Sequence, residues 1–270
     1  MRRISMLAPA MAALVLIAGC DSGGSKDDEE KRYDVAFATY QASVLGGVDR
    51  RMMVAVPADY EELDEPLPVL YLLHGWGGSE TDWTNQGRAV ETLSALYEAG
   101  DVVPMIVVMP NNVHPAANPL AGGPDRDLFL RELQTDIIPY VQVRYRASTD
   151  RSDRAIAGLS AGGIQTLNLT LFYPELWSYS FPMSTAYFPE DQARLDTDFA
   201  DDLDVAGVNS LEEFELAIAP DDALFYTLYQ TLQDVFDEKG IQYTTWEGPG
   251  AHTWAFWSTY FEVMAPKLFR

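Results

Sequence analysis

The chain has 270 residues, of which 47% are hydrophobic, and it carries 41 acidic against 18 basic side chains, a formal charge of -23. This hydrophobic content excludes a wholly disordered chain and a coiled coil, and the length suits one large α/β domain. So acidic a protein lacks the basic surface that nucleic acids and polyanionic substrates need, and we expect no nucleic-acid partner.

The first 19 residues have the pattern of a signal peptide. Arg2 and Arg3 precede an apolar run over residues 6–18, which is too short to span a bilayer comfortably. The run ends in LIAGC, which resembles a bacterial lipobox, and Cys20 is the only cysteine of the chain. We therefore expect export, removal of residues 1–19 and a lipid on Cys20 that anchors the protein at a bacterial membrane. The alternative is an ordinary secretory signal with a chance cysteine.

The segment that follows Cys20 cannot pack into a core. Its sequence, DSGGSKDDEEK, has no apolar residue beyond glycine. We expect a flexible acidic tether over residues 20–32 and a folded domain over residues 33–270.

Strands and helices alternate along the predicted domain. Strands are predicted over residues 33–43, 51–56, 68–73, 102–109, 155–157, 214–219 and 241–246. Helices are predicted over residues 89–97, 130–141, 164–172, 224–238 and 254–268. The first two strands read as an antiparallel pair, and the later strands are apolar, as buried parallel strands are. The pattern predicts an α/β fold: a mostly parallel sheet with helices on both faces. Residues 186–210 are acidic and irregular, which indicates a loop or lid.

The strongest motif is GLSAGG at residues 158–163. It fits G-x-S-x-G, directly after a predicted strand and directly before a predicted helix, which is the context of a nucleophile elbow. The sharp turn forces Ser160 into strained backbone angles, and the flanking glycines avoid clashes. We expect Ser160 to be a nucleophile. An inert serine in a glycine-rich packing turn is the alternative.

A serine hydroxyl needs a neighbouring base, and the chain has three histidines. His74 precedes a glycine-rich turn, and its side chain is better suited to bracing that turn. His114 lies in a loop rich in proline and asparagine. In α/β-hydrolases the base follows the nucleophile and the acid in the chain. Only His252 follows Ser160, so we expect His252 to be the base.

The acid of such a triad should follow a strand between Ser160 and His252. The predicted strand over residues 214–219 is followed by Asp221 and Asp222. We favour Asp222 and keep Asp221 as the alternative, because the acidic residues of the irregular segment 190–204 have no strand end to hold them.

A glycine-rich loop over residues 74–78 ends the first buried strand. Such a loop can offer a backbone N–H to an oxyanion, and we nominate Trp76, with Gly75 as the neighbouring alternative. The second donor is the N–H of Ala161, directly after the nucleophile. The spacing fits neither a phosphate-binding nor a dinucleotide-binding loop.

These motifs together resemble a family. The segments 71–78, 149–163 and 249–257, with Trp83, are similar to the α/β-hydrolases called putative esterases, which include esterase D, feruloyl and acetylxylan esterases and the mycolyltransferases. The resemblance extends over about residues 33–270 and implies the α/β-hydrolase fold. The family motif places the nucleophile at Ser160 and the histidine at His252. Its acid falls on Asp222 or Asp221, although this chain has APDD where the family often has Gly-x-x-Asp.

The resemblance implies a serine carboxylesterase that acts through an acyl-enzyme on carbohydrate-linked feruloyl or acetyl esters, or on small esters. It implies neither a metal nor an organic cofactor. Trp83 and Trp254 are the expected substrate-binding residues. They belong to a wider aromatic set that either lines a cleft or lies partly in the core: Trp76, Trp257, Tyr187 and Phe188. Two alternatives remain, an acyltransferase of the same fold and a non-catalytic binding lipoprotein. The sequence leaves the oligomeric state open.

Overall fold

The structure, a computed structural model, describes residues 32–114, 118, 120 and 128–270. The chain divides into two units, residues 1–30 and 31–270, and the description below concerns the second unit. The predicted signal peptide, Cys20 and all but the last residue of the predicted tether lie outside the described residues.

The second unit is built on an eight-stranded sheet in the order β1-β2-β4-β3-β5-β6-β7-β8. β1 pairs antiparallel with β2 and β2 antiparallel with β4, whereas the remaining pairs are parallel. The strands are β1 (Tyr33–Ala42), β2 (Val48–Pro57), β3 (Val69–Leu73), β4 (Ile106–Pro110), β5 (Arg154–Leu159), β6 (Tyr179–Met183), β7 (Glu213–Ile218) and β8 (Thr244–Glu247). The prediction of a mostly parallel sheet that starts with antiparallel strands is confirmed, but β6 is not among the strands that the sequence predicts.

Helices follow the strands in the expected alternation. The α-helices are α1 (Asp82–Asn85), α2 (Ala89–Ala99), α3 (Leu128–Glu132), α4 (Ile138–Arg144), α5 (Ala161–Phe172), α6 (Pro189–Arg194), α7 (Val205–Val208), α8 (Tyr226–Lys239) and α9 (Trp254–Met264). The π-helical turn η3 (Leu133–Ile137) joins α3 to α4. Short 3-10 turns are η1 (Ser43–Leu45), η2 (Tyr60–Glu62), η4 (Arg151–Asp153), η5 (Pro174–Leu176) and η6 (Ala265–Lys267).

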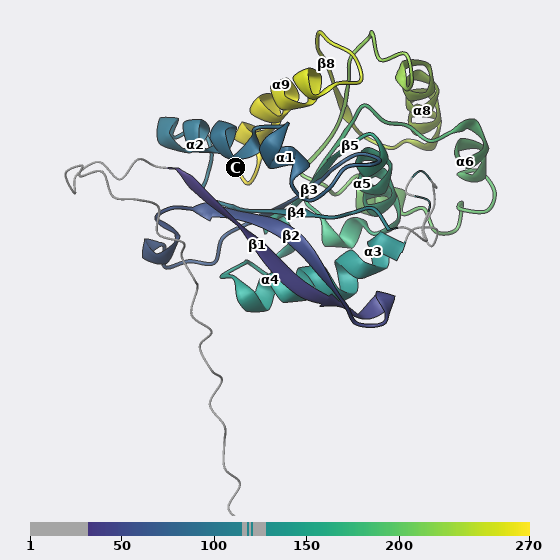
Figure 1. The fold of residues 1–270 in the computed structure, drawn as a ribbon. Helices are drawn as coiled ribbons and strands as arrows, with labels where there is room; N and C mark the ends of the chain where they lie inside the picture. Colours follow the sequence, from purple (N-terminus) through teal and green to yellow (C-terminus); the bar gives the residue numbers. More distant parts are fainter. Residues whose placement is uncertain (1–31, 115–117, 119, 121–127) are drawn as a thin grey trace, which may run out of the picture. The chain divides into compact units, whose positions relative to one another are not determined.

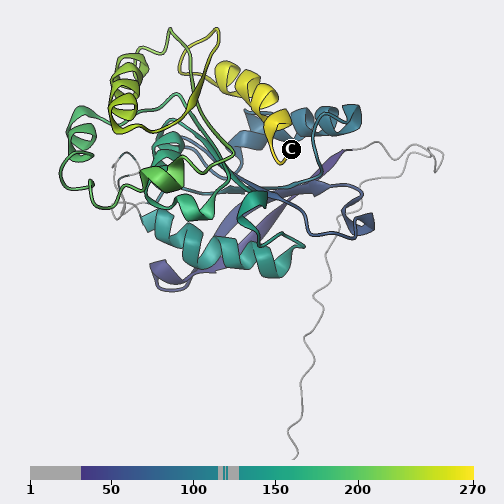
Figure 2. The same cartoon turned by 180° about the vertical axis from the view of Figure 1, so that it is seen from behind.

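The helices cover both faces of the sheet. α2 and α9 lie on one face, and α3 and α4 lie on the other (Figures 1 and 2). Alternate residues of the fully buried strand β3 face the two layers: Leu70 and Leu72 belong to the cluster that includes α2 and α9, whereas Tyr71 belongs to the cluster with α3 and α4. α5 and α8 pack together against β7 in a third cluster. Because successive side chains of a strand point to opposite faces of the sheet, the apolar residues of β3 contribute to two separate cores.

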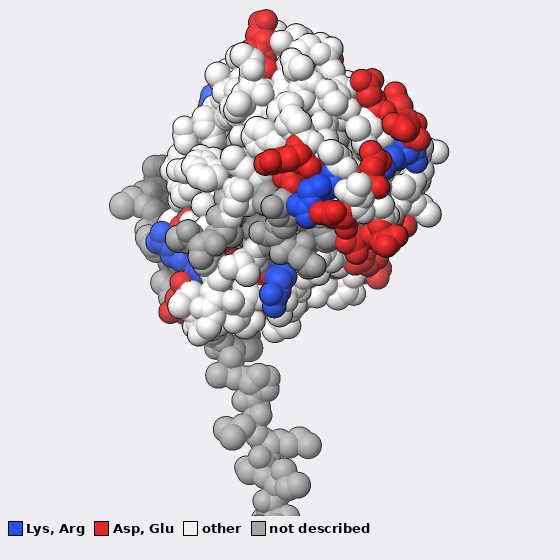
Figure 3. Space-filling view, turned by 90° about the vertical axis from the view of Figure 1, so that its right-hand side faces the viewer, with Lys and Arg blue, Asp and Glu red and all other residues white. Residues whose placement is uncertain are grey.

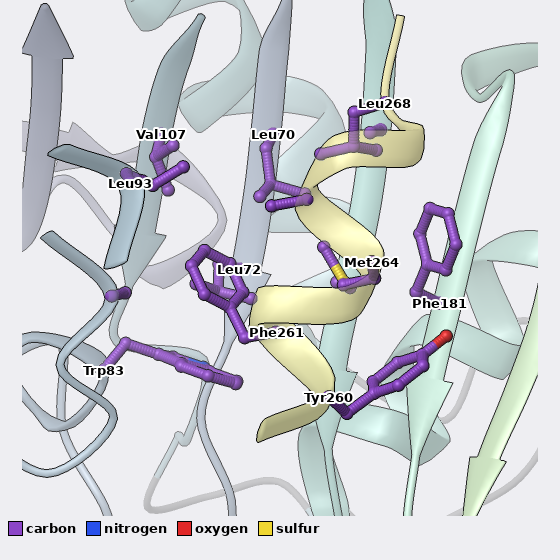
Figure 4. Close-up of a cluster of buried hydrophobic side chains, with 14 of the residues drawn as sticks. Leu70, Leu72, Trp83, Leu93, Val107, Phe181, Tyr260, Phe261, Met264 and Leu268 are labelled. Carbon is purple, nitrogen blue, oxygen red and sulfur yellow. The ribbon is translucent and has the colours of Figure 1, made fainter. Parts of the chain in front are cut away.

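The C-terminal helix α9 closes the first of these cores. Figure 4 shows Phe261, Met264 and Leu268 directed at Leu70 and Leu72 of the sheet. These side chains are fully buried. Burying side chains of this size contributes about 1.5–3 kcal/mol each, so α9 is held firmly on this face of the sheet.

Two strands begin later than the sequence predicts. β4 begins at Ile106 and not at residue 102, because Pro104 lacks the N–H that a central strand would donate. β8 begins at Thr244 and not at residue 241. There the chain leaves the left-handed helix cap at Gly240, and the N–H of Gln242 bonds to the side chain of Asn209 instead of a strand.

The acidic segment 186–210 contains the short helices α6 and α7, and the rest of it consists of turns and loops. Figure 3 shows acidic side chains gathered on this side of the molecule. The exposed acidic residues of the segment are Glu190, Asp196, Asp198, Asp201, Asp202 and Asp204. Arg194 forms ion pairs with Asp191 and Asp198, so part of this charge is compensated locally.

Candidate active site

Ser160 lies in the sharp turn between β5 and α5. Its backbone has φ 55° and ψ -118°, a conformation that is strained for a residue with a Cβ. The turn is held by close backbone approach: a Cβ at Gly158 would lie 2.4 Å from the carbonyl oxygen of Gly162, and one at Gly162 would lie 2.4 Å from that of His74. The glycines of the motif are therefore required by packing, and they bring the loop after β3 against the start of α5.

His252 and Asp222 complete a chain of hydrogen bonds that starts at Ser160. The distance from His252 Nε2 to Ser160 Oγ is 3.0 Å, and that from His252 Nδ1 to Asp222 Oδ2 is 2.8 Å. A carboxylate only accepts, so Nδ1 carries the hydrogen and Nε2 is free to accept from the serine hydroxyl. The structure brings together the three residues that the sequence nominates, from loops that follow β5, β7 and β8.

Asp222, and not Asp221, faces the histidine. Asp222 is fully buried, whereas Asp221 is exposed. The Oδ1 atom of Asp222 accepts from the N–H groups of Leu224 and Phe225, each at 3.1 Å. Burial raises the pKa of Asp222, but the hydrogen bonds from His252, Phe225 and Ser184 and the charge of His252 outweigh it, so the pKa lies below its ordinary value.

Two aromatic rings fix the plane of the His252 imidazole. Phe225 stacks on it with centroids 5.6 Å apart, and Trp257 meets it edge-on at 5.0 Å and 88°. The side chain of His252 remains 25% exposed. One part of the ring is therefore held by apolar contacts while another part stays open to a ligand.

The loop after β3 contacts the nucleophile. A Cβ at Gly75 would lie 3.4 Å from Cβ of Ser160 and 2.8 Å from the side chain of Leu159, so Gly75 permits this close approach. Trp76 follows and is 62% exposed. The predicted oxyanion donors, the N–H groups of Trp76 and Ala161, belong to the two segments that meet here, and their role remains a prediction.

A buried polar network that sequence reasoning missed holds this loop. Asn112 Oδ1 accepts from the N–H of His74, and Asn112 Nδ2 donates to the carbonyl oxygen of His74, both at 2.9 Å. Gln165 of α5 bonds to Asn112 through Oε1 at 2.7 Å and through Nε2 to the carbonyl oxygen at 2.9 Å. No local motif marks Asn112. The adjacent asparagines after the strand β4 are the signal that could have drawn attention to it.

His74 braces the loop, as the sequence suggests. Its Nδ1 lies 2.8 Å from the carbonyl oxygen of Gly75, and its Nε2 accepts from the N–H of Asn112 at 3.3 Å. Burial lowers the pKa of His74, which favours the neutral ring that this pattern of one donor and one acceptor requires.

Trp83 does not occupy the position that the sequence predicts. It is 1% exposed, its Nε1 donates to the carbonyl oxygen of Leu73 at 3.0 Å, and Figure 4 shows it beside Phe261 in the core. This burial contradicts the prediction that the Trp83 side chain contacts substrate. The physical reason is that α1 packs under the loop after β3, so its tryptophan supports the loop from within.

The other aromatic candidates divide between core and surface. Trp257 and Tyr187 are buried, and the hydroxyl of Tyr187 donates to Asn168 at 2.7 Å. Trp254 and Phe188 are half-buried. Trp254 meets both Trp83 and Trp257 edge-on at 5.3 Å, so it is the outermost member of an aromatic row that ends at His252.

Within the described residues, no group of three or more His, Cys, Asp or Glu side chains is arranged to hold a metal ion. In that same part of the chain, no helix is long and apolar enough to cross a membrane.

The chain is similar in sequence to known esterases. The chain is 36% identical over 132 residues to an endo-1,4-beta-xylanase/feruloyl esterase of Xylanibacter ruminicola, a match that covers 47% of this chain and 18% of that protein. It is 29% identical over 170 residues to an esterase of Mycobacterium tuberculosis, covering 59% of this chain and 34% of the relative. The matches therefore span about a third or less of the length of these curated relatives.

Solved structures share the fold. A CE1 ferulic acid esterase from Anaeromyces mucronatus superposes with a TM-score of 0.75 at 22% identity, covering 91% of this chain and 94% of that one. An S-formylglutathione hydrolase from Staphylococcus aureus gives 0.70 at 19% identity, covering 88% and 99%. The family model described as "Putative esterase" matches residues 43–268. The chain has the α/β-hydrolase fold and belongs to this esterase family.

Proposed function

We propose that the protein is a serine carboxylesterase in which Ser160 is the nucleophile, His252 the general base and Asp222 the acid that orients it. The observation that carries the proposal is the continuous pair of hydrogen bonds from Ser160 through His252 to the buried Asp222. The strained backbone of Ser160, at the start of a helix, supports it further.

The reaction follows from these positions. Ser160 Oγ attacks the ester carbonyl carbon while its proton passes to Nε2 of His252, and Asp222 stabilises the imidazolium that forms. His252 then returns the proton to the departing alcohol as the C–O bond breaks, which leaves an acyl group on Ser160. Water attacks the acyl-enzyme with His252 again as base, releasing the acid and the free serine.

The oxyanion of each tetrahedral intermediate needs fixed donors. We assign this role to the backbone N–H groups of Trp76 and Ala161, with Gly75 as the neighbouring alternative. The contact of Gly75 with Ser160 and the hydrogen bonds that Asn112 makes to His74 support the assignment, because both hold this loop against the nucleophile. Loss of one such donor typically costs about 2.7–4 kcal/mol of transition-state stabilisation.

The proposed substrates are carbohydrate-linked feruloyl or acetyl esters, or small esters. The curated relative from Xylanibacter ruminicola bears a feruloyl esterase name, and the aromatic side chains beside the site would suit a flat ring or a sugar face. Trp254 is the substrate-binding candidate that remains, and the exposed Trp76 side chain is its counterpart on the loop after β3.

The test is hydrolysis of p-nitrophenyl acetate, p-nitrophenyl butyrate, methyl ferulate and acetylated xylan, together with labelling by a fluorophosphonate. Turnover and labelling that vanish in Ser160→Ala support the proposal. Ser94→Ala is a matched control, because Ser94 is a part-buried helical serine outside the site. An unlabelled Ser160 with no turnover would leave a non-catalytic binding protein as the better description.

An acyltransferase is the second candidate, because the same acyl-enzyme can pass its acyl group to a sugar hydroxyl. Hydrolysis measured with rising concentrations of a sugar acceptor distinguishes the two. A transferase shows acylated sugar formed at the expense of free acid, whereas an esterase shows no such partition.

We also propose that the protein is exported and held at a membrane by a lipid on Cys20. The lipobox-like LIAGC and the acidic segment after it support this. Cys20→Ser is expected to shift the protein from the membrane fraction to the soluble exported fraction. Mass spectrometry of the wild-type N-terminus would show an acylated Cys20, and an unmodified cysteine there would overturn the proposal.

A further inference from the structure

A polar hollow lies at one end of the sheet and is separate from the candidate triad. It has a volume of about 520 Å³ and is lined by residues of β1, of β2 and of the segments after β3 and β4: Thr39, Asp49, Arg50, Arg51, Glu80 and Asn111. β2 runs antiparallel to β4, with Met52 opposite Pro110, so the first residues of β2 lie at the edge of the sheet where the parallel strands end. The polar hollow therefore lies at the same edge as Ser160, which follows β5.

The strand order shows how far the polar hollow is from the nucleophile. Three strand spacings separate β5 from β2, a distance of about 14 Å. The loop after β3 joins the two places, because Gly75 contacts Ser160 and Glu80 lines the polar hollow. The exposed Trp76 belongs to the same loop. A small ester bound at Ser160 does not reach so far, so a ligand that occupies both places must be extended.

The arginines and the buried carboxylate of the polar hollow are already paired. Arg51 Nη2 lies 2.9 Å from Glu80 Oε1, and Asn111 Nδ2 donates to Glu80 Oε2 at 3.3 Å. Arg50 pairs with the buried Glu132 at 2.8 Å. An ionic ligand would have to displace one of these pairs, and the formal charge of -23 further disfavours an anion. The lining therefore suits a neutral ligand that offers hydroxyl groups.

Open polar groups and an exposed aromatic ring lie side by side here. The side chain of Arg51 is 60% exposed, so N–H donors beyond the one at Glu80 stay open to a ligand. Its guanidinium lies over the ring of Phe37 at 4.7 Å, and Phe37 is 53% exposed. Thr39, two residues further along β1, lies on the same face, and Asp49 is exposed as well. A sugar ring complements this set, because its C–H face packs on an aromatic ring while its hydroxyls bond to polar side chains.

A second hollow of about 360 Å³ adjoins the polar hollow. It shares Thr39 and Asp49 with the first and continues to Asp136 and Tyr140. Two adjoining hollows suit a chain of sugars better than a single sugar.

We propose that the polar hollow is a subsite for the carbohydrate part of the substrate, where a neutral oligosaccharide binds while its esterified sugar lies at Ser160. The inference rests on the proposed function, because it names the substrate class of the same esterase. Small esters then react through the triad alone, whereas esters of an oligosaccharide gain affinity from Phe37 and Arg51.

The first test compares two substrates on each variant. It measures kcat/KM on an acetylated xylo-oligosaccharide and on p-nitrophenyl acetate. In Phe37→Ala and in Arg51→Ala, the ratio of the first value to the second is expected to fall about three- to tenfold, through a higher KM for the oligosaccharide. A variant that is partly unfolded lowers both values equally, so the ratio reports the subsite and not folding.

Matched variants change similar side chains outside the polar hollow. Val35→Ala removes another exposed apolar side chain from the same face of β1, two residues before Phe37. Arg32→Ala removes another exposed arginine that pairs with a carboxylate, that of Asp34. Neither residue lines the polar hollow, so both variants are expected to keep the wild-type ratio.

A second readout needs no turnover. In Ser160→Ala, titration with xylohexaose followed by NMR is expected to shift the backbone N–H signals of Phe37, Arg51 and Asn111. An oligogalacturonate of the same length, which is anionic, should leave these signals in place. Equal shifts with both would overturn the assignment to a neutral ligand.

The outcomes separate this inference from the proposed function. Signals that do not move with xylohexaose, or a ratio unchanged in both Phe37→Ala and Arg51→Ala, would overturn the subsite. Absence of turnover and of fluorophosphonate labelling in the wild type would instead overturn the proposed function. The titration of Ser160→Ala would still decide whether the polar hollow binds an oligosaccharide.

Discussion

The side-chain amide of Asn112 pairs with both backbone polar groups of His74, accepting from its N–H and donating to its carbonyl oxygen, each at 2.9 Å. A neighbouring strand would form the same two hydrogen bonds through its backbone, but here one side chain forms both. Asn112 therefore holds His74, the residue directly after β3, at the start of the loop that contacts the nucleophile. Gln165 of the helix after Ser160 belongs to the same hydrogen-bond network.

Asn112→Ala is therefore expected to lower kcat about tenfold to a hundredfold with a small effect on KM, since a displaced oxyanion loop loses part of the stabilisation that one donor supplies. Steady-state kinetics on p-nitrophenyl acetate measures it. Asn209→Ala is the control: Asn209 also bridges two backbone groups, Gly240 and Gln242, but away from Ser160. Equal kinetic losses in the two variants would contradict a local role for Asn112.

The two adjacent aspartates before α8 make a matched pair. Asp222→Asn is expected to reduce kcat by about 10⁴, the effect of removing the acid from a serine hydrolase triad, because the amide favours the wrong tautomer of His252. Asp221→Asn should retain nearly full activity, since Asp221 is exposed. If Asp221→Asn were the inactive variant, the assignment of the acid would be wrong.

The lowered pKa of Asp222 predicts how stability depends on pH. The folded pKa lies below the unfolded value of about 3.9, so the contribution of the anion is fully present above that value and is lost as the pH falls through the folded pKa. Asp222→Asn should be less stable than the wild type by about 1–3 kcal/mol near neutral pH. Urea unfolding should show this difference shrink below about pH 4. A difference that grows on acidification would contradict the assigned direction.

The strand–turn–helix around Ser160 could be predicted because its signal is local: an apolar strand, small residues and a helix follow one another within residues 155–172. His252 could be found because it alone follows the nucleophile. Asn112 could not be found in this way. Its partners His74 and Gln165 are 38 and 53 residues away in the chain, and the three residues meet only because the parallel strands β3, β4 and β5 end at one edge of the sheet.

The position of Trp83 could not be predicted either, because the sequence does not show whether a tryptophan near a catalytic loop points into the cleft or packs beneath the loop. Trp83→Phe removes the hydrogen bond to Leu73 and part of a fully buried ring, so the melting temperature should fall. Trp254→Ala should instead raise KM for aryl or sugar esters while stability changes less, because Trp254 is half-buried. A rise in KM for Trp83→Phe without loss of stability would contradict the core position.

The last prediction concerns Gly162, where the helix after the nucleophile touches the loop after β3. A Cβ at this position would lie 2.4 Å from the carbonyl oxygen of His74 and 2.9 Å from Cβ of Leu73, and neither atom can move away without displacing the loop. Gly162→Ala is therefore expected to reduce both the melting temperature and kcat. Gly100→Ala serves as the control, because Gly100 caps α2 at φ 77° and a Cβ there would meet no atom within 4 Å, so strain should cost about 1 kcal/mol of stability and leave kcat unchanged. Thermal unfolding and steady-state kinetics on the two variants check this. Full activity in Gly162→Ala would mean that the loop tolerates displacement and that its donors do not hold the oxyanion.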